Sequence, residues 1–379
     1  MNLFQQISDL FANVAPLPAG AHHLQSTADE TPYRLHLRLQ KDGSGILILN
    51  AATVLQLNPT AAECAFHFIK GTEREEAAKQ IAKRYRVSKK TALADFDSFA
   101  ERIGELIQTP DLDPASFLDF ERVAPHSANL TLRLDCAITY RLPEATHAQY
   151  APVKRVDREL STAEWQAIMD KAWAAGVPHI VFTGGEATLR DDLLMLIDHA
   201  EQNGQVCGLL TDGIKLADAS YLNMLLQTGL DHVMLILEPN NPKSWQAIDA
   251  IVPQDLFLTV HLTLNQDNAG EAESILKKLA ERGVTNISLS AAENSLTDEL
   301  LDLQNTAAAL GLTIRWDLPV PYSAANPVSQ ETLDDEIPQG AGKTWMYVEP
   351  DGDVLPAQGE AEHVLGNLLR DEWQTIFKQ

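Results

Sequence analysis

The chain has 379 residues, of which 45% are hydrophobic and 22% charged, so it is neither disordered nor fibrous and is long enough for two or three domains. No apolar run approaches the roughly 20 residues that a membrane-spanning helix needs, and the net charge of −24 disfavours nucleic acid as a partner, because each phosphate contact requires a cation. Cys64, Cys136 and Cys207 lie too far apart for a disulfide framework. We therefore expect a cytoplasmic protein without a membrane or nucleic-acid partner.

Residues 1–30 predict a short amphipathic helix followed by a proline-containing linker. Phe4, Ile7, Phe11 and Val14 recur at helical spacing, and two prolines then end the pattern. We expect this helix to dock on its own chain, with a partner-binding helix as the alternative.

Residues 31–108 predict a small α+β winged-helix domain. The stretches YRLHLRLQ, ILILN and TVLQLN alternate with period two and predict three antiparallel strands. Helices are then predicted to begin at Pro59, at Thr72 and after the capping residue Ser88.

This domain resembles the PqqD-like family, the peptide-recognition element of ribosomal-peptide maturation systems, through LNPTAAE and KGTEREEAAKQIAKRY. The resemblance implies that a leader peptide adds as a strand to the sheet edge beside the last helix. DNA binding is the alternative for a winged helix, but the last helix carries Asp95, Asp97, Glu101 and Glu105, which would repel phosphates. The residues expected to contact an acidic leader-like peptide are Leu47, Leu49, Val54, Leu57, Arg84, Arg86, Lys89 and Lys90.

After a linker at residues 109–127, residues 128–318 alternate strand and helix. Ser161 and Glu164 form a capping box before the first of these helices. Repeated β-α units predict a parallel sheet that curls into a partial, TIM-barrel-like (β/α) barrel. Ligands in such barrels bind at the carboxyl ends of the strands. The predicted fold class is therefore α/β, with a smaller extension over residues 319–379.

Two strand-end loops of this barrel, in VFTGGEATLRDDL and LLTDGIKL, resemble the radical SAM fold, most closely its branch with a C-terminal SPASM extension. In that family the GGE loop binds the amino group of S-adenosylmethionine. The residues that the resemblance places at such a site are Gly184, Gly185, Glu186, Thr211, Asp212 and Gly213. Asp212 stands where the family has Asn.

The three-cysteine motif of that family is incomplete in this chain. Cys136 matches its first position, but Tyr140 and Pro143 occupy the second and third. Gln339 and Ala357 occupy two positions at which the SPASM extension has cysteine. A four-iron cluster of this type needs three thiolates, which phenol and proline cannot replace. We therefore expect no iron–sulfur cluster and no other metal site.

The preferred hypothesis is a cluster-less radical SAM-like pseudoenzyme, accessory to ribosomal peptide maturation. It would bind a leader-like peptide or a partner protein, such as an active maturation enzyme, and we lean towards no enzymatic activity. One alternative is an enzyme or sensor that binds S-adenosylmethionine or another small molecule at the GGE loop. Another is a radical SAM peptide-modifying enzyme with unusual cluster ligation.

Overall fold

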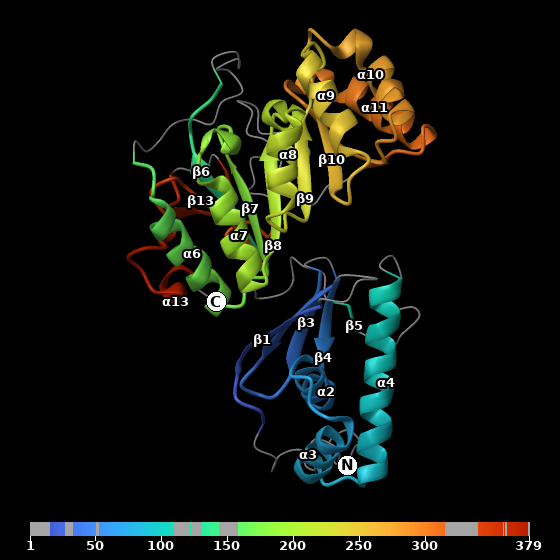
Figure 1. Cartoon of the computed structure of the whole chain (residues 1–379), viewed down its shortest axis with the longest axis vertical. Coiled ribbons are helices and arrows are strands. Elements are labelled where there is room, and N and C mark those ends of the chain that lie inside the picture. Colours follow the sequence, from blue (N-terminus) through green and yellow to red (C-terminus); the bar gives the residue numbers. More distant parts are fainter. Residues whose placement is uncertain are drawn as a thin grey trace. The chain divides into compact units, whose positions relative to one another are not determined.

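The computed structural model describes residues 16–26, 33–50, 53–109, 121–122, 131–143, 158–314, 340–358, 360 and 362–377. The chain divides into two compact units, coloured blue to cyan and green to red in Figure 1. The N-terminal unit comprises Met1–Ala128 with Ala174–Pro178, and the barrel unit comprises Asn129–Trp173 with His179–Gln379.

The N-terminal unit contains one antiparallel sheet with the order β1-β2-β3-β4-β5. Its strands are β1 (Gly20–Gln25), β2 (Arg34–Leu39), β3 (Gly45–Leu49), β4 (Thr53–Leu57) and β5 (Glu121–Arg122). β2 to β4 are the three predicted strands. The flanking strands β1 and β5 fall in the two segments that we predicted as linkers, and the helix predicted within residues 1–30 lies outside the described residues.

Three helices complete the N-terminal unit: α2 (Pro59–Ile69), α3 (Arg74–Tyr85) and α4 (Lys89–Gln108). Their starts follow from local capping chemistry. The side chain of Asn58 accepts a hydrogen bond from Ala61 N at 2.9 Å, and Ser88 Oγ accepts one from Thr91 N at 3.0 Å. Arg86 ends α3 in the left-handed region, at φ 55°.

The barrel unit contains a ten-stranded sheet with the order β12-β11-β10-β9-β8-β7-β6-β13-β14-β15. Neighbouring strands from β6 to β12 are parallel, as predicted. These strands are β6 (Arg133–Thr139), β7 (His179–Gly184), β8 (Val206–Thr211), β9 (His232–Ile236), β10 (Phe257–Leu264), β11 (Asn286–Ala291) and β12 (Thr313–Ile314).

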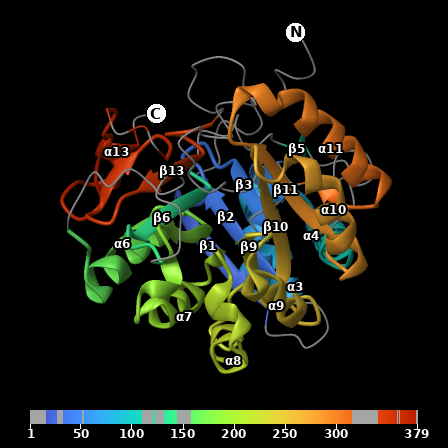
Figure 2. The same cartoon turned by 90° about the horizontal axis from the view of Figure 1, so that it is seen from above.

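Helices follow the barrel strands in alternation and lie along the outside of their curved row (Figure 2). They are α6 (Thr162–Ala174), α7 (Leu193–Asn203), α8 (Ala219–Leu226), α9 (Pro242–Ile251), α10 (Ala272–Glu281) and α11 (Thr297–Ala309). The Ser161–Glu164 capping box is present, because Ser161 N donates to Glu164 Oε2 at 2.9 Å and Glu164 N donates to Ser161 Oγ at 3.4 Å. The α/β partial barrel predicted from the sequence is confirmed.

The C-terminal residues extend the same sheet. β13 (Trp345–Val348) pairs in parallel with β6, and β14 (Asp353–Leu355) and β15 (Gly366–Asn367) continue it as antiparallel strands before α13 (Trp373–Ile376). Among the described residues, no helix combines the length and the apolar character needed to cross a bilayer.

The two faces of the barrel sheet differ in chemistry. Cys207 of β8 donates its Sγ–H towards Ile197 O of α7 at 3.8 Å, so its row of side chains faces the helices. The opposite row carries many polar groups. For example, His261 of β10 lies 3.0 Å from Ser288 Oγ and 3.0 Å from Ser290 Oγ, both on β11. A buried polar row facing away from the helices lines the barrel interior.

Candidate functional site

The loop after β7 approaches the end of β6 too closely for any residue except glycine. A Cβ on Gly184, whose φ is +130°, would lie 2.0 Å from Thr139 O, and one on Gly185 would lie 2.1 Å from Arg141 O. The contact is closed by two hydrogen bonds, from Gly185 N to Thr139 O at 2.7 Å and from Glu186 N to Arg141 O at 2.8 Å. This packing fixes the backbone position of Glu186.

The Glu186 carboxylate is buried and is held by donors from two strand ends. Oε1 accepts from Thr188 N at 2.9 Å, from Thr188 Oγ1 at 2.6 Å and from Thr211 Oγ1 at 2.8 Å. Oε2 accepts from Asp212 N at 2.8 Å. The residues that the sequence placed at one ligand site, 184–186 and 211–213, therefore do lie together, at the carboxyl ends of β7 and β8.

Asp212 is the second buried carboxyl of this loop pair, with 8% of its surface exposed. Its Oδ1 accepts from Ile214 N at 2.9 Å, while its Oδ2 is buried and accepts no hydrogen bond from any residue that the structure describes. Burial, together with the negative charges of Glu186 and Glu238, raises the pKa of Asp212 to about 7. An unsatisfied acidic oxygen beside a second carboxylate suits a cationic or hydrogen-donating ligand.

Cys136 lies in β6, but its side chain belongs to the helix-facing row. Leu134, Ile180 and Cys207 are aligned across β6, β7 and β8, and Cys136 is two residues beyond Leu134 on the same strand face. It is fully buried, and burial raises the pKa of its thiol well above the usual range. A thiolate is therefore disfavoured at this position.

Tyr140, at the second position of the motif, is hydrogen bonded to the C-terminal extension. Its hydroxyl donates to Glu349 Oε1 at 3.0 Å, and the Tyr347 hydroxyl donates to Tyr140 Oη at 3.4 Å. Tyr140 also packs on the small apolar cluster of Ala137, Tyr347 and Leu355. It acts here as a link between β6 and β13.

The other expected cluster positions carry no thiol. Pro143 is partly buried, Ala357 is 1% exposed, and Gln339 lies outside the described residues. All three cysteines are buried and none is joined to another by a disulfide. Cys64 belongs to α2 of the N-terminal unit, whereas Cys207 of β8 faces α7 and lies in register with Ile180 of β7 and Leu134 of β6.

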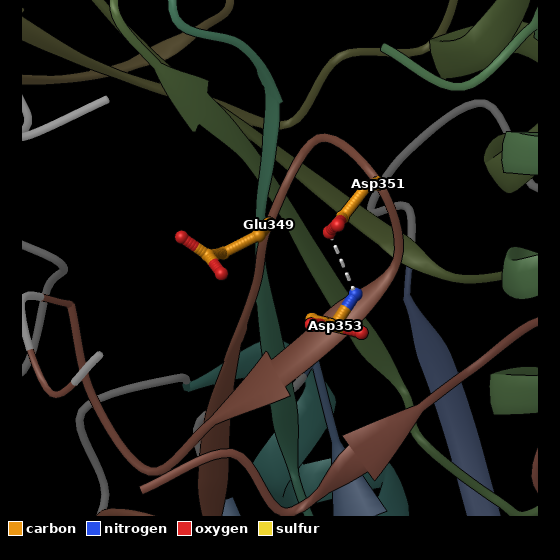
Figure 3. A group of neighbouring side chains, drawn as sticks. All are labelled: Glu349, Asp351 and Asp353. Atoms are coloured by element: carbon orange, nitrogen blue, oxygen red, sulfur yellow. Dashed lines mark hydrogen bonds between the residues drawn. The ribbon is translucent and has the colours of Figure 1, made fainter. Parts of the chain in front are cut away.

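Three carboxylates gather at the turn between β13 and β14, although the sequence predicted no metal site. Ligand oxygens of Glu349, Asp351 and Asp353 lie within 4.8 Å of one another (Figure 3). Asp353 N donates a hydrogen bond to Asp351 Oδ1 at 3.1 Å, and Glu349 accepts a hydrogen bond from the Tyr140 hydroxyl. These bonds account for the group as the polar part of a tight turn.

The predicted peptide-contact residues of the N-terminal unit lie in two different settings. Leu47, Leu49, Val54 and Leu57 are at most 5% exposed, so their side chains belong to the core. β3 is an inner strand of the sheet, because β2 and β4 pair with it on both sides. β4 is also paired on both sides, with β3 and, at Leu55 and Gln56, with β5.

The basic residues of the N-terminal unit differ in their exposure. Arg84 Nε lies 2.7 Å from Oε2 of the buried Glu63, so this guanidinium takes part in an internal ion pair. Arg86, Lys89 and Lys90 are exposed. These three residues form the part of the predicted basic set that a peptide could reach.

A groove that the sequence did not indicate lies beside these elements. It has a volume of about 500 Å³ and is lined by residues from the end of β4, from α2 and from α4. Its polar lining includes Gln56, Asn58, Asp95, Ser98 and Arg102. Only its position between a strand and the last helix agrees with the predicted mode of peptide recognition.

Comparison with known proteins defines the class of the barrel unit. Residues 136–291 match the model of the Radical SAM superfamily. The fold is accordingly that of a radical SAM partial barrel.

Particular relatives are peptide-modifying proteins by name. The PqqA peptide cyclase of Streptomyces rochei is 29% identical over 248 residues, which span 58% of this chain and 67% of that protein. That of Rhizobium meliloti (strain 1021) is 30% identical over 161 residues, only 37% of this chain and 41% of the relative. The matched part therefore leaves a third or more of each relative uncovered.

Solved structures of Streptococcus suis SuiB share the fold over most of the chain. SuiB bound to its precursor peptide SuiA has a TM-score of 0.60 at 13% identity, covering 94% of this chain and 89% of SuiB. SuiB bound to S-adenosylmethionine has a TM-score of 0.58 at 14% identity, covering 93% and 88%.

These comparisons contradict the prediction that the protein has no iron–sulfur cluster. The superfamily match, the peptide cyclases and the S-adenosylmethionine-bound neighbour together point to cluster binding, so that prediction is wrong. The described residues nevertheless do not offer the three-thiolate set of the family motif, since Cys136 faces the helices and Tyr140 is bonded to Glu349. We therefore derive no chemical step through a cluster.

Proposed function

We propose that this protein is a radical SAM-type enzyme that acts on a ribosomally made precursor peptide and binds S-adenosylmethionine at the ends of β7 and β8. The observation that carries the proposal is the buried Glu186 carboxylate, held by Thr188, Thr211 and Asp212 at the carboxyl ends of two parallel strands. This is the edge at which α/β barrels bind their ligands.

The chemistry of the loops suits this ligand. S-adenosylmethionine carries an ammonium group, and two buried carboxyls, Glu186 and Asp212, supply negative charge where little water competes. Because the Gly184–Gly185 backbone docks against β6, Glu186 is positioned before any ligand arrives, which lowers the entropic cost of binding.

The peptide part of the proposal is supported by the relatives and by the N-terminal unit. SuiB is described with a precursor peptide, and the cyclases are named for the peptide PqqA. We propose that the N-terminal unit is a PqqD-like winged-helix domain that recognises a leader segment in the groove between the end of β4, α2 and α4. The exposed Arg86, Lys89 and Lys90 favour an acidic segment.

The comparisons do not support the pseudoenzyme hypothesis that the sequence led us to prefer. Relatives named as cyclases favour the enzyme alternative instead. The chemical nature of the modification is left to experiment, because no described residue implies a particular bond change.

Cofactor binding can be tested by calorimetry on the full chain under anaerobic conditions with S-adenosylmethionine. We expect Glu186→Ala to weaken binding about tenfold or more, as expected for loss of a charged hydrogen-bonding group. Glu281→Ala, an exposed change at the end of α10, is the control and should bind as the wild type does. No heat with the wild type at millimolar ligand would refute cofactor binding.

The activity can be tested by incubating the full chain with synthetic peptides encoded by short reading frames beside its gene, with S-adenosylmethionine and a reductant. We expect mass spectrometry to show a changed peptide mass that depends on the cofactor. If a peptide binds tightly to the wild type but keeps its mass under all of these conditions, the enzymatic proposal fails.

A further inference from the structure

Asp212 has features that a purely structural residue would not need. It is 92% buried, and its Oδ2 accepts no hydrogen bond from the described residues, although buried carboxylate oxygens are nearly always satisfied. The Asp212 carboxyl can donate a hydrogen bond to the Glu186 side chain while it is protonated, but once ionised it has no cationic partner among the described residues.

The groups around Asp212 make its charge costly in the absence of a ligand. Glu186, from the loop after β7, accepts a hydrogen bond from the Asp212 backbone, and Glu238 follows β9. The cation of this region, Lys215 of the turn after β8, is directed elsewhere: its Nζ donates to Thr188 O at 2.8 Å and lies 4.6 Å from the Tyr221 ring of α8. Two acids thus face Asp212 from neighbouring strand ends, without a direct cationic partner among the described residues.

We propose that Asp212 is a specificity-determining residue that binds the cationic amino-acid end of the ligand through Oδ2 and gives up a proton when that ligand enters. The inference rests on the proposed function and deepens it. In the free protein, burial and the two neighbouring acids favour the protonated carboxyl. An entering ammonium group reverses that preference, because it neutralises the acids and supplies the missing donor. The only bond broken is the O–H of Asp212, and the proton passes to the buffer.

The coupling predicts a specific pH dependence. The pKa of Asp212 is raised to about 7, so the carboxyl is mostly protonated at pH 6 and mostly ionised at pH 8. If binding requires the ionised form, affinity should fall about fivefold between pH 7 and pH 6, where the ammonium group of the ligand stays mostly protonated. At pH 7, about half a proton should be released for each ligand bound.

The test is calorimetry of the full chain with S-adenosylmethionine at pH 7 in two buffers of different ionisation enthalpy, phosphate and Tris. We expect the observed heat to differ between the buffers by the value that corresponds to about half a proton in the wild type. Asp212→Asn, which has the same shape without the acid, should lose this difference and bind about tenfold more weakly at pH 8. Asp198→Asn, an exposed change on α7, should keep both properties.

A second ligand separates recognition from a general effect on the fold. 5′-Methylthioadenosine lacks the amino-acid end and the positive charges, so Asp212→Asn should leave its affinity within about twofold of the wild type. If Asp212→Asn lowered the affinity for both ligands equally, Asp212 would have a structural role and the inference would be overturned. Heat with S-adenosylmethionine but no buffer dependence would overturn the inference while leaving the proposed function intact, and no heat at all would remove both.

Discussion

The close approach of the loop after β7 to β6 makes Gly185→Ala the sharpest test of the site geometry. The added Cβ would lie 2.1 Å from Arg141 O and 2.9 Å from Tyr140 C, both backbone atoms that no side-chain rotation can move away. The loop must therefore shift, and Glu186, the next residue, must shift with it.

The size of the effect can be worked out from these contacts. Overpacking of this kind costs about 1–3 kcal/mol. The same shift weakens the bonds from Gly185 N to Thr139 O and from Glu186 N to Arg141 O, each worth about 1 kcal/mol. We expect the barrel unit to lose about 2–5 kcal/mol in its free energy of unfolding. Because Glu186 moves, affinity for S-adenosylmethionine should fall by about tenfold or more.

The assay is urea unfolding followed by tryptophan fluorescence. All six Trp residues of the chain belong to the barrel unit, so this signal reports on that unit alone. Gly270→Ala is the matched control, because its Cβ would meet nothing within 4 Å and its backbone is not in the left-handed region. If the Gly185 variant unfolds at the same urea concentration as the Gly270 variant and still binds the cofactor normally, the reasoning about this loop is refuted.

Three further predictions concern stability. Gly104→Ala in the middle of α4, where a Cβ meets nothing within 4 Å, should stabilise the N-terminal unit by about 0.5–1 kcal/mol, seen as a higher midpoint in circular dichroism; a lower midpoint would contradict it. Glu63→Ala should destabilise that unit by about 2–4 kcal/mol, because it removes the 1%-exposed partner of Arg84; no change would mean that the pair contributes nothing. Burial lowers the pKa values of His36 and His261 to about 3, so the unfolded chain binds protons before the folded chain does as the pH falls. Below pH 6.5, each histidine should therefore reduce the free energy of unfolding by up to about 1.4 kcal/mol per pH unit. Urea midpoints measured between pH 7.5 and pH 5 would show or exclude this slope.

Local signals in the sequence were sufficient for most elements of the fold. Ser88 and the Ser161–Glu164 pair cap helices through hydrogen bonds between residues three positions apart, so these helix starts can be predicted without the tertiary structure. The convergence of the loops at residues 184–186 and 211–213 was also predictable, because carboxyl ends of adjacent parallel strands meet at one sheet edge.

Contacts between residues far apart in the sequence could not be predicted in the same way. β13 is four residues long and pairs with β6 across more than 200 positions, a register that no local pattern specifies. Tyr140 was interpreted only as a missing cluster ligand, whereas its hydroxyl binds Glu349 of the extension. The segment GAHHLQ was predicted as part of the linker, whereas it forms β1 by pairing with β2.

The parallel pairing of β13 with β6 has a consequence for biosynthesis. While the ribosome is still translating the barrel helices, β6 has already emerged with one side hydrogen bonded to β7 and the side that β13 will cover still bare. That side stays unpaired at least until residues 345–348 leave the exit tunnel. The nascent chain therefore exposes an unpaired strand edge from the emergence of β6 until the emergence of β13, and chaperone demand should be greatest in that interval.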